Sequence, residues 1–281
     1  MFSKLLKHEW KANAGLLGIL SLCALGAGVM GVFVIQAMGY LSQIDTGDDS
    51  TGVALGYTGL VSIIFFIVLG LVAYFLAVQF INVFRFYKSL FTDDGYLTFT
   101  LPVNVHQIFW SSFLNILVWV AISALVVLVS VLLMLFVGTG VLMETLMDAG
   151  QGLGGTMEDI LIEEPGYVSY VWLSLVSGIV SVLYFIFMVM TSITIGSVLA
   201  KKHKILASVG MYYAINMVVG IVESVLTVFP TMLEMAAFIY DSGYYTYGNI
   251  TMVITIVLQL GLCIVGYFIS TSLMKNRLNL P

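Results

Sequence analysis

The sequence predicts an all-α, multi-pass membrane protein that forms one transmembrane domain over residues 1–281. Of its residues 60% are hydrophobic and 9% are charged, and the mean hydropathy is +1.08, values far from those of soluble domains. Its basic residues occur in four clusters that long apolar stretches separate. Since Lys and Arg near span ends mark the cytoplasmic side, the clusters predict an even number of spans with both termini in the cytoplasm.

Acidic residues fill the gaps between the basic clusters and reinforce this topology. The clusters are Lys4, Lys7 and Lys11; Arg85 and Lys88; Lys201, Lys202 and Lys204; and Lys275 and Arg277. The gaps carry Asp45, Asp48, Asp49, Glu144, Asp148, Glu158, Asp159, Glu163, Glu164, Glu234 and Asp241, without a Lys or Arg. A membrane span needs about 20 apolar residues. Six stretches meet this requirement, at residues 14–41, 54–84, 105–143, 167–200, 205–229 and 248–273.

The first twelve residues predict a separate interfacial helix ahead of the first span. Apolar and basic side chains alternate there at helical spacing, which is typical of a helix that lies in the membrane interface. The residues assigned to this helix are Phe2, Lys4, Lys7, Glu9, Trp10 and Lys11. The alternative is a plain basic flank of the first span.

Residues 85–103 predict a structured elbow on the cytoplasmic side. Gly95 is suited to end a short helix, and Pro102 prevents that helix from continuing. Asn104 followed by Gln107 is typical of the capped start of the third span. The adjacent acids Asp93 and Asp94 either terminate the short helix or form a docking surface, because complementary charges fix the register of a partner.

Pro230 is expected to end the fifth span. The following residues, 231–240, then read as a short helix on the outer side, too brief to cross the membrane.

Glu223 is the one acidic residue inside an apolar span. A helix that starts near Ile205 places it roughly 27 Å along the span, at the outer interface. Tyr212 and Asn216 share approximately its helix face, so the three are candidates to line a translocation path. The alternatives are a carboxylate hydrated at the outer headgroups and a cap on the broken helix.

Other polar and small residues within the spans predict contacts between helices. In-span amides suited to hydrogen bonds are Gln36, Gln79, Asn82, Asn115 and Gln259. Small residues four apart, which permit close approach, are Ala24 with Gly28, Ala27 with Gly31, and Ser174 with Gly178.

The sequence contains no recognisable enzymatic motif. It has no G-x-x-x-x-G-K-[ST] loop for nucleotide hydrolysis and no His or Cys spacing typical of a metal site. We therefore expect a non-enzymatic chain without its own cofactor or metal, and with membrane lipids rather than nucleic acid around it.

Two segments, with the six-span layout, resemble permease subunits of type-2 ABC transporters, particularly the bacterial kind from Gram-positive lineages. They are residues 2–12 (FSKLLKHEWKA) and residues 85–103 (RFYKSLFTDDGYLTFTLPV). The second lies where that family places its coupling helix, between spans two and three. The acidic connection 144–166 is longer than in the family core.

This resemblance implies the permease half of an ATP-driven exporter in a bacterial plasma membrane. The implied partners are a cytoplasmic ATPase subunit, which binds ATP and Mg²⁺, and a second permease copy or paralogue. The implied ATPase-docking residues are Arg85, Lys88, Asp93, Asp94, Gly95 and Tyr96. The alternatives are a secondary transporter or channel, which would need coupling-ion residues near the midplane, and a membrane-embedded accessory or scaffold protein. The sequence does not indicate a substrate.

Overall fold

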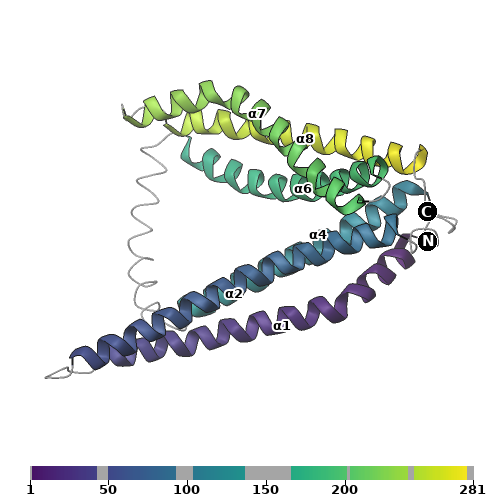
Figure 1. Cartoon of the computed structure of the whole chain (residues 1–281). Coiled ribbons are helices and arrows are strands. Elements are labelled where there is room, and N and C mark those ends of the chain that lie inside the picture. Colours follow the sequence, from purple (N-terminus) through teal and green to yellow (C-terminus); the bar gives the residue numbers. More distant parts are fainter. Residues whose placement is uncertain are drawn as a thin grey trace. The chain divides into compact units, whose positions relative to one another are not determined.

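The computed structural model describes residues 2–42, 50–92, 104–136, 166–200, 203–239 and 244–276, and within them the only regular elements are helices. These are α1 (Phe2–Ser42), α2 (Ser50–Phe91), α4 (Val105–Phe136), α6 (Tyr167–Leu199), α7 (Lys204–Ile239) and α8 (Tyr244–Asn276) (Figure 1). Each contains a stretch long and apolar enough to cross a membrane. The prediction of an all-α, multi-pass membrane protein is confirmed at this level.

Two predicted helix boundaries are absent from the structure, one after residue 12 and one before Arg85. Residues 2–12 are helical, but they continue without interruption into the first span as α1. Neither Gly nor Pro occurs before Gly15, so no residue there breaks the helix. In the same way α2 runs through Arg85 to Phe91. The rest of the predicted elbow, residues 93–103, lies outside the described residues, as does the connection 137–165.

The predicted break at Pro230 is wrong, because α7 continues through this residue to Ile239. Proline removes only one intrahelical hydrogen bond, and membrane helices tolerate it where neighbouring groups compensate. Thr231 Oγ1 donates to the carbonyl oxygens of Thr227 (2.8 Å) and Val228 (3.0 Å), so the residue after the proline keeps helical contacts with the preceding turn. Residues 231–239 are therefore the last turns of α7 rather than a separate outer helix.

The chain divides into two compact units. Unit 2 consists of residues 3–82 and 114–154, and unit 1 of residues 1–2, 83–113 and 155–281. The core of unit 2 joins α1, α2 and α4 through buried apolar side chains. Its buried members are Leu17, Ala24, Leu71, Tyr74, Val78, Trp119, Val126 and Met134.

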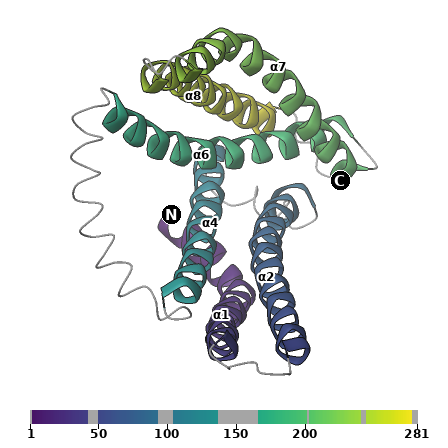
Figure 2. The ribbon, with the colours of Figure 1, turned by 90° about the vertical axis from the view of Figure 1, so that its left-hand side faces the viewer.

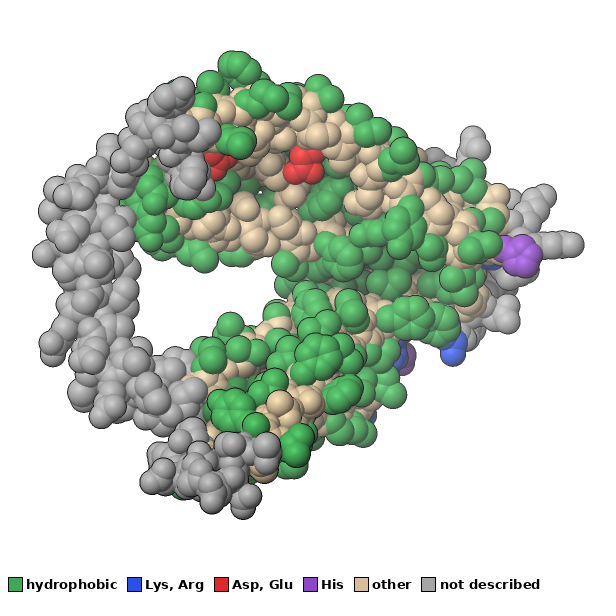
Figure 3. Space-filling model, turned by 60° about the vertical axis from the view of Figure 1, so that its left-hand side comes forward, with side chains coloured by type: hydrophobic (Ala, Val, Ile, Leu, Met, Phe, Trp, Pro, Cys, Tyr) green, Lys and Arg blue, Asp and Glu red, His purple; other side chains and the backbone are tan. Residues whose placement is uncertain are grey.

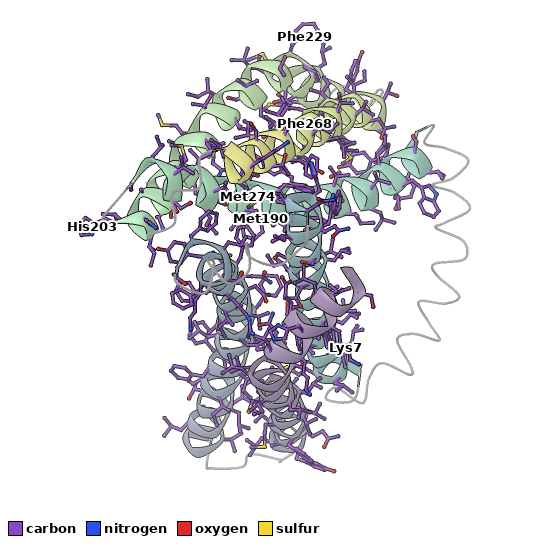
Figure 4. The ribbon with its side chains drawn as sticks, turned by 90° about the vertical axis from the view of Figure 1, so that its right-hand side faces the viewer. Lys7, Met190, His203, Phe229, Phe268 and Met274 are labelled. Atoms are coloured by element: carbon purple, nitrogen blue, oxygen red, sulfur yellow. The ribbon has the colours of Figure 1, made fainter. Side chains whose placement is uncertain are left out.

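Unit 1 is built on α6, α7 and α8, which pack against one another (Figure 2). Met190 of α6 and Met274 of α8 are buried, whereas Phe229 of α7 and Phe268 of α8 are exposed; all four are labelled in Figure 4. An exposed aromatic surface of this kind suits a helix that faces lipid. The closest approach is at Gly196, where an added Cβ would lie 2.4 Å from the Cα atom of Ser208.

Candidate functional site

Four polar side chains from three helices lie near one level of unit 1. Ser181 Oγ of α6 donates a hydrogen bond to Gln259 Oε1 of α8, at 3.2 Å. Tyr184 follows Ser181 by about one turn, and Glu223 of α7 lies within electrostatic reach of its hydroxyl. Gln259 is buried and the other three are half-buried. We call Ser181, Tyr184, Glu223 and Gln259 the mid-span polar group.

The register of α7 against its neighbours independently brings Glu223 to this level. Gly196 touches Ser208, and Glu223 lies fifteen residues after Ser208 while Ser181 lies fifteen residues before Gly196. Because α6 and α7 are antiparallel and rise equally per residue, Glu223 and Ser181 lie at one height.

The contact between α7 and α8 gives the same result. An added Cβ at Gly248 would lie 2.9 Å from Glu234 Oε1. Glu223 precedes Glu234 by eleven residues, and Gln259 follows Gly248 by eleven. These helices are also antiparallel, so Glu223 and Gln259 lie at one height.

The length of α7 removes one of the explanations for Glu223. The sequence placed it at the outer interface, because a span that starts near Ile205 puts it roughly 27 Å along the helix. With α7 extending to Ile239, Glu223 is nineteen residues from the first residue of the helix and sixteen from the last. It is therefore a mid-helix carboxylate, and a cap on a broken helix is no longer an explanation for it.

Tyr212 and Asn216, the other two candidate path residues, have different relations to the mid-span polar group. Tyr212 is, like Glu223, within electrostatic reach of Tyr184. Asn216 Nδ2 donates to the carbonyl oxygen of Tyr212 at 2.9 Å, a bond within α7. Sequence reasoning missed Ser181 and Tyr184, although their three-residue spacing in an apolar span was a readable signal.

Polar contacts continue from this group toward both ends of unit 1. Toward the basic ends of the helices, Ser270 Oγ donates to Thr191 Oγ1 at 3.2 Å. Toward the opposite ends, Asn249 Nδ2 donates to Ser169 Oγ at 2.7 Å. Figure 3 shows acidic side chains (red) among the hydrophobic surface of these helices. Polar contacts between α6 and α8 therefore recur at three levels of unit 1.

The end of α2 is fixed within unit 1. Phe86, Leu90 and Phe91 are buried. Lys204 Nζ, at the start of α7, donates to the carbonyl oxygen of Phe91 at 3.4 Å. A cation is favourable at a helix C-terminus, where carbonyl groups lack intrahelical partners. The predicted docking residues Arg85 and Lys88 belong to this anchored end, with Lys88 exposed.

The start of α4 is fixed within the same unit by aromatic side chains. Phe113 and Phe187 of α6 have ring centroids 4.6 Å apart. Phe109 packs edge to face on Tyr267 of α8 at 5.3 Å. The Tyr267 hydroxyl is 2.7 Å from His106 Nδ1. Both flanks of residues 93–103 are therefore held by α6, α7 and α8.

The structure describes only some of the remaining residues that were predicted to dock the ATPase or to form the interfacial helix. Asp93, Asp94, Gly95 and Tyr96 lie outside the described residues. Lys7 and Lys11 are exposed, and Lys7 points away from the helices (Figure 4). Trp10 stacks on Trp119 of α4, with ring centroids 5.1 Å apart, so it packs on protein in unit 2. The side chains of Phe2 and Lys4 are not described, and Glu9 is half-buried.

No group of three or more His, Cys, Asp or Glu side chains that could hold a metal occurs among the described residues. Comparison of the chain with protein-family models, with curated proteins and with solved structures gives no match. Function must therefore be argued from the residues themselves.

Proposed function

We propose that this chain is the membrane-spanning permease subunit of an ATP-driven exporter. In this proposal the segment 85–103 acts as a coupling helix that docks on a separate cytoplasmic ATPase, which binds ATP and Mg²⁺. A second permease copy or paralogue completes the translocation path. The mid-span polar group, with Tyr212 and Asn216, lines this chain's share of that path in a bacterial plasma membrane.

The observation that supports the proposal most directly is the anchoring of both flanks of residues 93–103. The Lys204–Phe91 contact holds one flank, and the Phe113–Phe187 contact holds the other. A segment fixed at both ends to α6, α7 and α8 can pass a displacement to the helices that carry the mid-span polar group. A loosely attached loop between two spans would absorb the same displacement.

The test is charge reversal of the acidic pair, Asp93→Lys with Asp94→Lys. We expect the chain to insert and remain stable but to lose both co-purification of the ATPase subunit and stimulation of its ATP hydrolysis. The matched control is Asp48→Lys with Asp49→Lys, another adjacent acidic pair, in the loop predicted on the other side of the membrane. Retention of both properties in the first variant refutes the docking assignment. Absence of any co-purifying ATPase with the unmodified chain refutes the exporter itself.

One observation favours a second candidate, a secondary transporter driven by an ion gradient. Such proteins bind coupling ions near the midplane, and Glu223 lies midway along α7, within electrostatic reach of Tyr184. Inside-out vesicles separate the two mechanisms. Solute movement that follows an imposed pH gradient without ATP, and stops in Glu223→Gln, would support the secondary transporter.

A further inference from the structure

Three asparagine side chains are buried in unit 2, one on each of its helices. Asn13 of α1 is 1% exposed, Asn82 of α2 is 2% exposed and Asn115 of α4 is 6% exposed. Leaving buried amide groups without hydrogen bonds is costly, so nearly all such groups in proteins are paired with protein or with ordered water. These three therefore call for an explanation.

The register between α1 and α2 puts Asn13 and Asn82 at one height. Ser21 Oγ of α1 and the Tyr74 hydroxyl of α2 are hydrogen-bonded at 2.8 Å. Asn13 lies eight residues before Ser21, and Asn82 lies eight residues after Tyr74. Because the two helices are antiparallel, equal separations from a shared contact mean equal height.

The register between α1 and α4 adds Asn115 to the same level. An added Cβ at Gly28 of α1 would lie 2.7 Å from the Ser130 Cβ of α4. Asn13 lies fifteen residues before Gly28, and Asn115 lies fifteen residues before Ser130. These two helices are parallel, so the three asparagines form one layer across unit 2. We call them the asparagine layer.

Five of the six amide atoms of this layer have no hydrogen-bond partner among the residues that the structure describes. This applies to both the Oδ1 and Nδ2 atoms of Asn13 and Asn82 and to Oδ1 of Asn115. It also applies to the indole Nε1 of Trp119, which follows Asn115 by about one turn and is buried. Long helical side chains point back toward the helix N-terminus, which directs the Trp119 indole toward the layer.

The mixture of donors and acceptors identifies the ligand class. Oδ1 atoms accept hydrogen bonds, whereas the Nδ2 and indole nitrogens only donate. A metal cation would pair with the oxygens and leave the N–H groups unpaired. Water both donates and accepts, and a buried water typically forms about three hydrogen bonds to polar groups of this kind.

We propose that the asparagine layer is a binding site for a small cluster of water molecules inside the α1–α2–α4 bundle. The layer lies toward the ends of the helices that carry Lys7, Lys11 and the Arg85 cluster, so water reaches it from that side. This assignment does not depend on the exporter proposal. It concerns a hydrated plane in the part of the chain that does not carry the mid-span polar group.

Radiolytic footprinting tests the assignment, because X-rays convert bound water to hydroxyl radicals that oxidise adjacent side chains. The full chain is irradiated in nanodiscs in ¹⁸O-labelled water, and oxidation is followed by mass spectrometry. Trp119 and Met134 are the paired reporters, since both are buried in the same core at 4% and 6% exposure. Methionine and tryptophan both react with this radical near the diffusion limit, so a five-fold difference in oxidation reports the water beside each side chain.

We expect Trp119 to be oxidised at least five-fold faster than Met134 in the unmodified chain. Replacing the layer with leucine (Asn13→Leu, Asn82→Leu, Asn115→Leu) should reduce Trp119 oxidation to the Met134 level. Ser130→Ala is the matched control, because it removes another buried, unpartnered polar atom of α4 outside the layer. It should leave Trp119 oxidation unchanged.

Two results would overturn the assignment. Equal protection of Trp119 and Met134 in the unmodified chain would show a dry layer, whatever the stability of the leucine variant. Protection of Trp119 that appears only when sodium or potassium replaces a large organic cation would show that a metal cation occupies the layer instead of water.

Discussion

Substitution of Gly196 by alanine should weaken the packing of α6 on α7 strongly. The added Cβ would meet the Cα and N atoms of Ser208, both at 2.4 Å, and its Oγ atom at 2.6 Å. Two of these are backbone atoms, which cannot move aside by rotation of a side chain. The helices must separate locally or tilt.

The expected magnitude follows from the kind of atom that each added methyl group meets. Overpacking in well-packed regions costs about 1–3 kcal/mol, and a clash with backbone belongs at the upper end. Gly178→Ala in the same helix is the matched control, since an added Cβ there has nothing within 4 Å. That change should be neutral, or stabilising by up to about 1 kcal/mol through helix propensity.

Gly31→Ala in α1 provides an intermediate case. The three atoms nearest to its added Cβ would all belong to the side chain of Met134, with the Cε atom at 2.6 Å. A flexible methionine can yield, so a loss of about 1 kcal/mol or less is expected.

Unfolding with sodium dodecyl sulfate in mixed micelles measures the three variants on one scale. The order of stability should be Gly178→Ala, then Gly31→Ala, then Gly196→Ala. A difference of about 3 kcal/mol between the extremes corresponds to a more than hundred-fold change in the unfolding equilibrium. Equal stability of Gly196→Ala and Gly178→Ala would refute the register on which the mid-span polar group was built.

Three further predictions follow from contacts and charges. Glu223→Gln should alter transport while leaving expression and ATPase association unchanged. An unchanged transport rate would favour the alternative, in which Glu223 is a carboxylate hydrated at the outer headgroups. Ser21→Ala and Tyr74→Phe should show a coupling free energy of about 0.6 kcal/mol in a double-mutant cycle of micelle unfolding, and no coupling would contradict the shared hydrogen bond. After replacement of the two native cysteines, a cysteine at Tyr244 should react in intact cells with an impermeant thiol reagent, and one at His203 should not. Labelling of a cysteine at His203 would contradict the predicted topology, in which this position faces the cytoplasm.

The existence of six apolar helices could be predicted because span length and hydropathy are local properties of the sequence. Helix ends were harder to predict. Pro230 is a reliable breaker only where water competes for the freed carbonyl, and α7 continues through it. Residues 2–12 form part of α1 because nothing in them forces a break.

The pairing of helices could not be predicted, because many glycines offer equivalent close contacts. The small-residue spacing correctly indicated Gly28 and Gly31, which meet Ser130 and Met134, but Gly178 meets nothing within 4 Å. Gly196, the tightest contact with backbone, was not singled out. Without the Gly196–Ser208 contact, the sequence alone could not predict that Glu223 and Ser181 lie at one height. The docking residues 93–96 stay a prediction.

The order of residues in the two units has a consequence for synthesis of the protein. Unit 2 draws on no residue after 154, whereas residues 83–113 of unit 1 pack with helices that begin at Tyr167. During elongation at about 5–20 residues per second, Phe113 therefore waits roughly 4–15 s for Phe187 to be made. The first bundle can close before the second has its components, and the aromatic start of α4 stays accessible to the insertion machinery during that interval.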